Sequence, residues 1–288
     1  MYPAAFEYHA PGSVQEALGL LGKLDDAKIL AGGHSLVPMM KLRLAQPKHL
    51  IDLRKVPGLS GIKEEGSTIV IGAMTTHWEV ESSKLLQAKC AVLSDTAKII
   101  GDPAVRNKGT IGGSLAHADP AADIPATVIA LGAELVCQGP KSKRTVKVDE
   151  WFQGLMATAL GEDELLVEIR VPALTPGTGS AYMKFAHPAS RFAIVGAAAV
   201  ITVDKQGTCT KAGVGITGAG TKAVRAKGVE AGLVGKRLDA ATIEAAAQKA
   251  AEGVDVQADL QGSVEYKSHL CRVFARRAIE AAAKKATA

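Results

Sequence analysis

The chain has 288 residues and a mass of 29.8 kDa, which is enough for about two domains of the usual ~100–200 residues. Its composition of 47% hydrophobic and 22% charged residues is typical of globular proteins and excludes a disordered, collagen-like or coiled-coil chain. The aromatic content of 4% argues against a groove that stacks nucleic-acid bases. The net charge of +5 is mild, and its excess lies partly in the last predicted helix, which is more typical of a solvated helix face than of a nucleic-acid arm. No apolar run approaches the ~18 residues that a membrane span requires.

Residues 1–56 are predicted to form a small unit in which strands alternate with helices. A capping box at Ser13–Glu16 begins a helical pattern of apolar residues. The elements expected are a helix over 13–24, a strand over 28–31, a helix over 36–44 and a strand over 49–53. Gly32-Gly33-His34-Ser35 joins the first strand to the second helix, so this unit reads as β-loop-α-β.

Residues 57–174 form a second predicted unit, built around a mostly antiparallel sheet. Strands are expected over 67–75, 133–138, 145–148 and 165–171, and helices from the capping box at 76–79 and over 92–100. The passage 102–123 is polar and rich in glycine, and we expect it to be irregular. Asp123 is expected to cap a further helix whose first turn contains Pro125.

The segment 172–179 is the best linker in the sequence, since it contains two prolines and two glycines. It separates an N-terminal domain over 1–174 from a C-terminal domain over 178–288. In the C-terminal domain we expect a three-stranded antiparallel sheet and three helices, with strands over 180–185, 194–203 and 210–217 and helices over 221–233, 239–253 and 263–285. The predicted fold class is therefore α+β.

A first candidate site is the glycine pair Gly32–Gly33 between a predicted strand and a predicted helix. Glycine allows a close approach of the backbone to a ligand and a positive φ. The amides of the next three residues, His34, Ser35 and Leu36, would point outward at a helix start, a position that suits a phosphate. A tight strand-to-helix turn accounts for the same residues, so this motif alone leaves both interpretations open.

A second glycine pair, Gly112–Gly113, is flanked by the hydroxyl residues Thr110 and Ser114. It lies in the irregular passage of roughly twenty residues, and long loops of this kind in compact domains are usually functional. One such loop could hold one phosphate. Two of them in the same predicted domain suit the two phosphates of a pyrophosphate, so together they predict a dinucleotide site.

Two further motifs are weaker. His117, Asp119 and Asp123 are residue types that bind metals, but no fourth ligand is evident nearby, and we expect no tightly bound metal. The run Gly213–Gly218 matches G-x-G-x-x-G, yet the chain passes from 233–235 directly into another predicted helix. A Rossmann unit requires a strand there, ending near an acidic residue, so we interpret the run as a glycine-rich strand and turn.

The cysteines carry information about cofactors and compartment. They are dispersed and form no C-x-x-C pair, which excludes a cysteine-ligated iron–sulfur cluster within this chain. The first residues show no basic segment followed by an apolar one, so no signal peptide is predicted. Free cysteines without an export signal favour a cytoplasmic protein. The four positions are Cys90, Cys137, Cys209 and Cys271.

The two glycine motifs resemble the two FAD pyrophosphate loops in the medium subunit of molybdenum hydroxylases, the xanthine oxidase family. Carbon monoxide dehydrogenase medium subunits are the most similar group. The resemblance covers essentially the whole chain and includes the segments Phe6–Pro11, Asp102–Asn107 and Ser263–Lys267. It implies a two-subdomain FAD-binding fold of the vanillyl-alcohol oxidase type, with subdomains 1–56 and 57–174, followed by the C-terminal domain.

The resemblance also implies a set of FAD-binding residues. Residues 29–36 and 110–114 would enclose the diphosphate, Asp123 would bind the ribityl chain or nearby polar groups, and Leu166 and Lys184 would lie by the flavin ring. Without the resemblance, these last two read as a core strand residue and a surface lysine. The complete set is Ile29, Leu30, Ala31, Gly32, Gly33, His34, Ser35, Leu36, Ile100, Thr110, Ile111, Gly112, Gly113, Ser114, Asp123, Leu166, Lys184 and Phe192.

One departure from the family pattern concerns the substrate. Carbon monoxide dehydrogenase medium subunits carry a Gly-Asp-Tyr stretch whose tyrosine covers the flavin, whereas this chain has Ala189-Ser190-Arg191-Phe192. Phe192 keeps an aromatic face without the hydroxyl, and Arg191 replaces an acid with a cation. This weakens the assignment of carbon monoxide as substrate but not that of the enzyme class.

The function implied is that of the FAD-carrying subunit of a heteromeric oxidoreductase. In the family, substrate is oxidised at a molybdenum cofactor on a large subunit, and electrons pass through two [2Fe–2S] clusters on a small subunit to FAD and then to an external acceptor. A dimer of heterotrimers is the expected assembly, and we expect no general acid or base in this chain. Two alternatives stay open, a free-standing FAD-dependent oxidoreductase of the same fold and a non-redox interaction subunit that retains the loops as scaffold.

Overall fold

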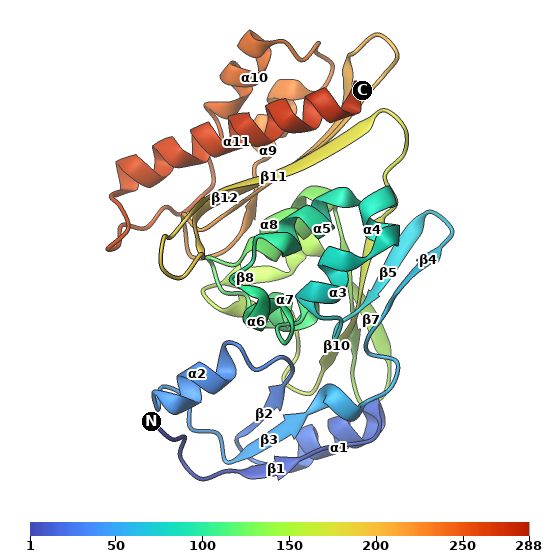
Figure 1. Ribbon diagram of the computed structural model, residues 1–288, viewed down its shortest axis with the longest axis vertical. Helices are drawn as coiled ribbons and strands as arrows, with labels where there is room; N and C mark the ends of the chain where they lie inside the picture. The colour runs from blue at the N-terminus through green and yellow to red at the C-terminus, as the bar shows by residue number, and fades with distance from the viewer. Residues whose placement is uncertain (288) are drawn as a thin grey trace.

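The computed structural model describes residues 1–287 and arranges them in three units along the long axis of the molecule (Figure 1). The N-terminal unit lies at one end, a five-stranded sheet with its helices in the middle, and the C-terminal sheet with its long final helix at the other end. This arrangement confirms the α+β class predicted from the sequence. Among the described residues, no helix is both long and apolar enough to span a membrane.

The N-terminal unit is a three-stranded parallel sheet with the strand order β1-β3-β2. On one side of it, α1 buries Ala17 and Leu18 in a cluster with Ile51 of β3. The elements are β1 (Glu7–His9), α1 (Val14–Lys23), β2 (Ala27–Leu30), α2 (Leu36–Lys41), β3 (His49–Asp52) and the short 3₁₀ helix η1 (Leu53–Lys55). The strand β1 was not expected, because its three residues show no apolar alternation.

The predicted capping box of α1 is only half formed. The Ser13 hydroxyl accepts a hydrogen bond from the Glu16 amide at 3.1 Å, as expected of an N-cap. The Glu16 carboxylate, however, accepts from the amide of Gly12 at 2.7 Å and not from that of Ser13. The reciprocal bond is therefore displaced by one residue, while the start of the helix is as predicted.

The middle unit is an antiparallel sheet with the strand order β4-β5-β10-β6-β7, covered by a group of short helices. Its strands are β4 (Ile62–Glu65), β5 (Thr68–Gly72), β6 (Glu134–Gln138), β7 (Lys143–Lys147) and β10 (Leu165–Pro172), with a small hairpin of β8 (Phe152–Gly154) and β9 (Ala157–Thr158). Its helices are α3 (His77–Ser82), α4 (Lys84–Lys89), α5 (Ala91–Lys98), α6 (Pro103–Arg106), α7 (Ile111–His117), α8 (Asp123–Leu131) and η2 (Val148–Glu150).

The passage 102–123 is not irregular as predicted, because it contains α6 and α7. Asp102 caps α6 by accepting from the Val105 amide at 3.0 Å, with proline in the first turn. Thr110 caps α7 by accepting from the Gly113 amide at 3.0 Å. Aspartate and threonine are as typical of N-caps as of loops, so the polar residues that suggested a loop here begin two helices.

The C-terminal domain is an antiparallel sheet with the strand order β11-β12-β13-β14. Three of its strands were predicted. The fourth, β14, consists of two residues that pair with β13 where the sequence analysis expected the beginning of a helix. The elements are β11 (Thr178–Ala186), β12 (Ala193–Val203), β13 (Cys209–Thr217), β14 (Val224–Arg225), α9 (Lys227–Leu233), α10 (Ala240–Ala247) and α11 (Val264–Ala286).

The apolar helix α8 joins the middle unit to the C-terminal sheet. All nine of its residues are buried, and it packs on β12 and β13, while α11 lies along β11 and β12 (Figure 1). A Cβ atom at Gly213 or Gly215 would overlap a carbonyl oxygen of α8. The G-x-G-x-x-G run is therefore a glycine-rich strand, as predicted, and its glycines serve helix packing.

Candidate cofactor site

The two glycine motifs, far apart in the sequence, are in contact in the structure. We call residues 31–35 the first glycine loop and residues 107–114 the second glycine loop. A Cβ atom added to Gly32 would overlap the Lys108 carbonyl oxygen and lie 2.7 Å from the Cα atom of Gly109. A Cβ atom at Gly113 would lie 3.5 Å from that of Ala31. The structure therefore brings together the two loops that the sequence analysis paired.

A cleft of about 410 Å³ lies at this junction, between the N-terminal unit and the middle unit. The first glycine loop and the beginning of α2 form one wall, η1 forms another, and the second glycine loop closes the third. Its lining residues are Leu30, Ala31, Gly32, Gly33, Val37, Leu53, Arg54, Val56, Ser60, Met74, Thr76, Glu79, Asn107, Lys108 and Thr110.

The first glycine loop leaves its backbone donors open. Gly33 has a φ of +76°, a conformation that glycine adopts without strain. The N–H groups of residues 32–36 donate to no acceptor among residues 1–287. Backbone polar groups left without partners are costly unless water or a ligand satisfies them, so this loop offers a row of donors suited to an anion.

The second glycine loop uses its donors internally. The amides of Ile111 and Gly112 donate to the carbonyl oxygens of Thr75 and Ala73 at 3.0 and 2.9 Å, and the Gly113 amide donates to the capping hydroxyl of Thr110. The first turn of α7 is thus anchored to the end of β5. In contrast to the first glycine loop, the second has no free N–H groups at residues 111–113, so it would contact a ligand in the cleft mainly through its side chains.

Cationic side chains stand in the cleft wall. Arg54 and Lys108 both line it, and Arg54 is held by Asp52, whose Oδ2 atom accepts from the guanidinium Nε at 2.8 Å. Tyr8 donates to the same carboxylate at 2.6 Å. Burial alone would raise the pKa of Asp52, but the hydrogen bonds from Arg54 and Tyr8 hold it below its ordinary value. The sequence analysis missed Arg54, whose position beside the cleft depends on the sheet.

His77, the first residue of α3, supports the second glycine loop from beneath. Its amide donates to the Gly109 carbonyl at 2.9 Å, and its ring fills the space where a Cβ atom of Gly109 would lie. The ring is buried and its Nδ1 atom has no partner among the described residues. Burial first, and then the positive fields of His34 and Arg106, lower the pKa of His77 to about 4. In the sequence, His77 is only the residue after the N-cap Thr76, and nothing in that position predicts that its ring packs under the second glycine loop.

A buried polar cluster joins α8 to β11. Tyr182 donates to Asp123 Oδ1 at 2.6 Å, and Lys184 Nζ donates to Asp123 Oδ2 at 3.0 Å. All three side chains are almost fully buried. Burial raises the pKa of Asp123, with the Lys184 cation and the Tyr182 hydroxyl opposing that shift. The predicted capping role of Asp123 is wrong, because Ala122 occupies the N-cap and the Asp123 carboxylate bonds across to β11.

Lys184 also links the segments that carry two other predicted residues. Its Nζ atom donates to the carbonyl oxygens of Ile99 and Arg191, at 2.9 and 2.7 Å, next to Ile100 and Phe192 in the chain. Arg191 has a φ of +61° in this turn, and Phe192 is 46% exposed.

Leu166, by contrast, is a core residue of β10 that pairs with Cys137 of β6. It takes no part in the hydrogen bonds around Lys184. Its assignment to the flavin site therefore stays a prediction.

The weak metal motif of the sequence analysis does not form a cluster. Among residues 1–287, His117, Asp119 and Asp123 do not bring three ligand atoms together. Asp119 instead accepts from the Ala121 amide at 2.8 Å, and Asp123 is engaged with Tyr182 and Lys184. Asp119 therefore stabilises the turn between α7 and α8, and Asp123 joins α8 to β11.

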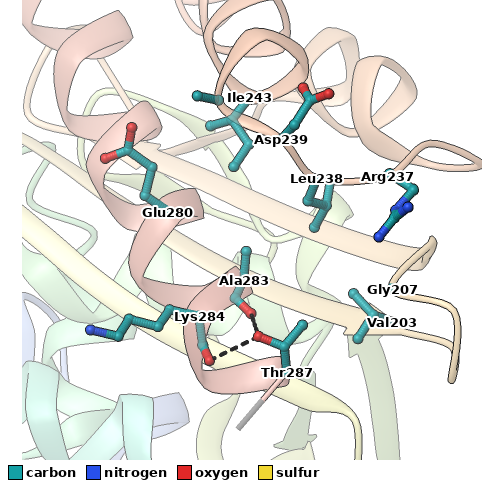
Figure 2. A pocket seen from close by; sticks show the side chains of 11 residues that line it. Val203, Gly207, Arg237, Leu238, Asp239, Ile243, Glu280, Ala283, Lys284 and Thr287 are labelled. Atoms are coloured by element: carbon teal, nitrogen blue, oxygen red, sulfur yellow. Dashed lines mark hydrogen bonds between the residues drawn. The ribbon is translucent and has the colours of Figure 1, made fainter.

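A larger cavity of about 680 Å³ lies in the C-terminal domain, between α10, the end of α11 and the β12–β13 turn (Figure 2). Its charged side chains are of both signs, with Glu280 and Lys284 on α11 and Arg237 and Asp239 on the segment that leads into α10. Asp239 caps α10 by accepting from Thr242, and the Thr287 hydroxyl bonds back to α11 (Figure 2). These groups serve local structure, and the cavity lies far from the glycine loops (Figure 1).

Comparison with known sequences finds two family models that match the chain. Residues 4–174 match the family described as "FAD binding domain in molybdopterin dehydrogenase", and residues 180–282 match the "CO dehydrogenase flavoprotein C-terminal domain". The carbon monoxide dehydrogenase medium chain of Hydrogenophaga pseudoflava is 47% identical over 98% of both chains. The 6-hydroxypseudooxynicotine dehydrogenase complex subunit alpha of Paenarthrobacter nicotinovorans is 38% identical over 99% of this chain and 97% of that one.

Solved structures give the same result. Carbon monoxide dehydrogenase from Hydrogenophaga pseudoflava has a chain that superposes with a TM-score of 0.96 at 48% identity, covering 99% of each chain. Quinoline 2-oxidoreductase from Pseudomonas putida 86 has one with a TM-score of 0.93 at 33% identity, covering all of each chain.

The chain belongs to the family of FAD-binding subunits of molybdenum hydroxylases. Within that family it is similar along its whole length to carbon monoxide dehydrogenase medium chains, and it is a flavoprotein component of an oxidoreductase.

Proposed function

We propose that the chain binds FAD at the junction of its two glycine loops and carries electrons from iron–sulfur clusters of a partner subunit to an external acceptor. The observation that supports this most strongly is the backbone contact between Gly32 and Gly109. It places a loop with open N–H donors and a helix-capping loop against the same cleft. Glu79, the one acidic residue among the described residues that line the cleft, is engaged in the capping box of α3, where its carboxylate accepts from the amide and the hydroxyl of Thr76 at 2.7 Å each.

The FAD-binding residues that we propose are those implied by the resemblance, with Arg54 and Lys108 added for their position in the cleft wall. The N–H groups of residues 32–36 would bind and orient the diphosphate, and the two cations would offset its charge. The residues implied by the resemblance are Ile29, Leu30, Ala31, Gly32, Gly33, His34, Ser35, Leu36, Ile100, Thr110, Ile111, Gly112, Gly113, Ser114, Asp123, Leu166, Lys184 and Phe192.

When bound, FAD supplies the redox chemistry of this subunit, and the protein supplies position and electrostatics. The buried Asp123–Lys184 pair fixes the segments around Ile100 and Phe192 relative to one another, since Lys184 bonds to their neighbours Ile99 and Arg191. We assign no general acid or base to this chain. Its residues hold the cofactor and shape the surface at which a partner delivers electrons.

The partners proposed are a large molybdenum-binding subunit and a small subunit with [2Fe–2S] clusters, in a dimer of heterotrimers. The four cysteines of this chain are all buried, dispersed along the sequence and unsuited to a shared cluster. Free thiols also suit a reducing compartment, so we propose a cytoplasmic complex. Substrate identity would then depend on the large subunit, and Arg191-Phe192 would distinguish this chain from the Gly-Asp-Tyr pattern at the flavin face.

Anaerobic stopped-flow absorbance tests this division of labour. Carbon monoxide, a purine, an N-heterocycle or an aldehyde mixed with the isolated FAD-loaded chain should leave the flavin oxidised. The same addition to the complex with its molybdenum and iron–sulfur partners should bleach the flavin, and an acceptor should restore it. Bleaching of the isolated chain would instead favour a free-standing flavoenzyme. Purification without yellow flavin would favour the scaffold alternative.

A further inference from the structure

Two histidines and a glutamate converge on one face of the N-terminal sheet, away from the glycine loops. The parallel strands β1 and β3 pair with Glu7 opposite His49 and His9 opposite Ile51. Because alternate residues of a strand face the same side of a sheet, Glu7, His9 and His49 share one face. Tyr8, on the opposite face, bonds instead to Asp52 beside the cofactor cleft.

The three side chains present their ligand atoms to a common point. His9 Nε2 lies 3.2 Å from His49 Nδ1, and Glu7 Oε2 lies 3.4 Å from His49 Nδ1 and 3.9 Å from His9 Nε2. The two histidine side chains are mostly buried, with 24% and 17% exposed, while that of Glu7 is 74% exposed. Two imidazoles are thus fixed by the sheet, and a carboxylate reaches them from solvent.

These distances are close to the edges of a metal coordination tetrahedron. Ligands at about 2.0–2.2 Å from a zinc ion lie about 3.3–3.6 Å from one another. The two separations from His49 are near this range, and the third, at 3.9 Å, needs only a small movement of the exposed Glu7 side chain. One hydrogen bond satisfies only one of the three contacts, whereas a divalent cation at the centre binds all three ligand atoms. Two imidazole nitrogens and one carboxylate suit Zn²⁺ and similar transition ions better than Ca²⁺ or Mg²⁺.

We propose that Glu7, His9 and His49 form a binding site for a divalent transition-metal cation, with water in the fourth position. The site is independent of the FAD site and of the proposed electron relay. Its ligands come from an edge strand of three residues and from the central strand of a small sheet. Binding would therefore tie β1 to β3 and stabilise the N-terminal unit, which carries the first glycine loop.

The sequence analysis considered a metal only at His117, Asp119 and Asp123 and expected none to be tightly bound. His9 and His49 are far apart in the chain and belong to no spaced motif. Only the pairing of β1 with β3 brings them together. Glu7 is exposed, and the proposed site has only three protein ligands. We therefore expect it to exchange its metal, in contrast to a closed structural zinc site with four protein ligands.

Calorimetric titration of Zn²⁺ into the FAD-loaded, chelator-treated protein, with any affinity tag removed, tests the site directly. We expect one equivalent of Zn²⁺ to bind. His49→Gln and Glu7→Gln should each weaken that binding by at least the roughly 10–100-fold that loss of an outer-shell partner costs. His269→Gln, which removes an exposed histidine of α11, is the matched control and should bind as the wild type does.

Two further measurements keep the test decisive if His49→Gln folds poorly. Bound Co²⁺ should give tetrahedral d–d absorption bands at longer wavelengths than the flavin. Zn²⁺ should raise the Tm of the wild type but not that of Glu7→Gln. The Glu7 side chain is mostly exposed, so this substitution should leave the fold intact. Absence of a stoichiometric Zn²⁺ site in the wild type overturns the proposal. So does equal affinity of the wild type and Glu7→Gln.

Discussion

Gly32 and Gly109 lie in direct backbone contact, although they belong to different units of the molecule. The space in which a side chain of Gly32 would lie is occupied by the Lys108 carbonyl and the Gly109 Cα atom. The two glycine loops can therefore approach this closely only because residue 32 has no side chain.

Gly32→Ala should weaken FAD binding by forcing these loops apart. Overpacking of this kind costs about 1–3 kcal/mol, which corresponds to a Kd about five- to 150-fold higher. The measurement is flavin fluorescence during titration of the FAD-free protein. Gly19→Ala in α1 is the control, because nothing lies within 4 Å of its added Cβ atom, and helix propensity predicts a gain of up to about 1 kcal/mol in stability. Unchanged FAD affinity in Gly32→Ala would contradict the two-loop site.

Lys184→Met should strongly destabilise the protein, since it leaves the buried Asp123 carboxylate with Tyr182 alone. Removing one member of a buried ion pair costs about 3–5 kcal/mol. The double variant Lys184→Met/Asp123→Asn should recover much of that loss, because the uncompensated charge is gone. Urea denaturation of the FAD-free protein measures the free energy of unfolding of the wild type, of Lys184→Met and of the double variant.

The matched control for this cycle is Lys211→Met, which removes an exposed lysine from the same sheet and should change stability by less than about 0.5 kcal/mol. If the double variant is no more stable than Lys184→Met, the pair does not act through its charges. Because burial raises the pKa of Asp123, a measured titration of the wild type should give a value above that of a free aspartate.

The long periodic segments and the glycine motifs of this chain were predictable from local sequence. The capping residue Ser13 and the helical pattern that follows it predict α1, and the helical pattern over 263–285 predicts α11; the structure contains both helices. The first glycine pair was recognised by its place between a predicted strand and a predicted helix, and the second by the hydroxyl residues that flank it in a long polar passage. Their mutual contact, in contrast, depends on how the N-terminal unit packs against the middle unit.

Residues whose roles depend on distant partners were missed or misassigned. Aspartate is a common N-cap residue, so Asp123 was predicted to cap a helix. Its carboxylate instead accepts a hydrogen bond from Tyr182 of β11, which follows much later in the chain. His77 and Arg54 carry no motif, and only the tertiary structure buries one and places the other in the cleft wall. Asp102 and Thr110 were interpreted as loop residues because caps and loops use the same side chains.

Gly213→Ala should destabilise the interface between α8 and the C-terminal sheet. An added Cβ atom would overlap the Ala130 carbonyl oxygen, and the helix would have to move away from β13 at a cost of about 1–3 kcal/mol. Thermal denaturation should show this loss. Gly22→Ala, at an open position of α1, should show none, and equal Tm values for Gly213→Ala and the wild type would contradict the close packing.

The buried imidazole of His77 should make the protein less stable in mild acid. Its pKa is lowered to about 4, mainly by burial, whereas an unfolded histidine titrates near 6.5. Between these values the unfolded chain binds a proton that the folded chain does not, so stability falls as the pH falls through this window. The full difference amounts to about 3 kcal/mol.

His77→Gln removes this titration and should flatten the stability profile between about pH 4 and pH 6.5. Urea denaturation at closely spaced pH values measures the slope, and His269→Gln, whose ring is exposed, should keep the slope of the wild type. Carboxylates such as Asp52 contribute their own loss only at lower pH, because their folded pKa lies below the ordinary value. An unchanged slope in His77→Gln would mean that folding does not lower the pKa of this ring.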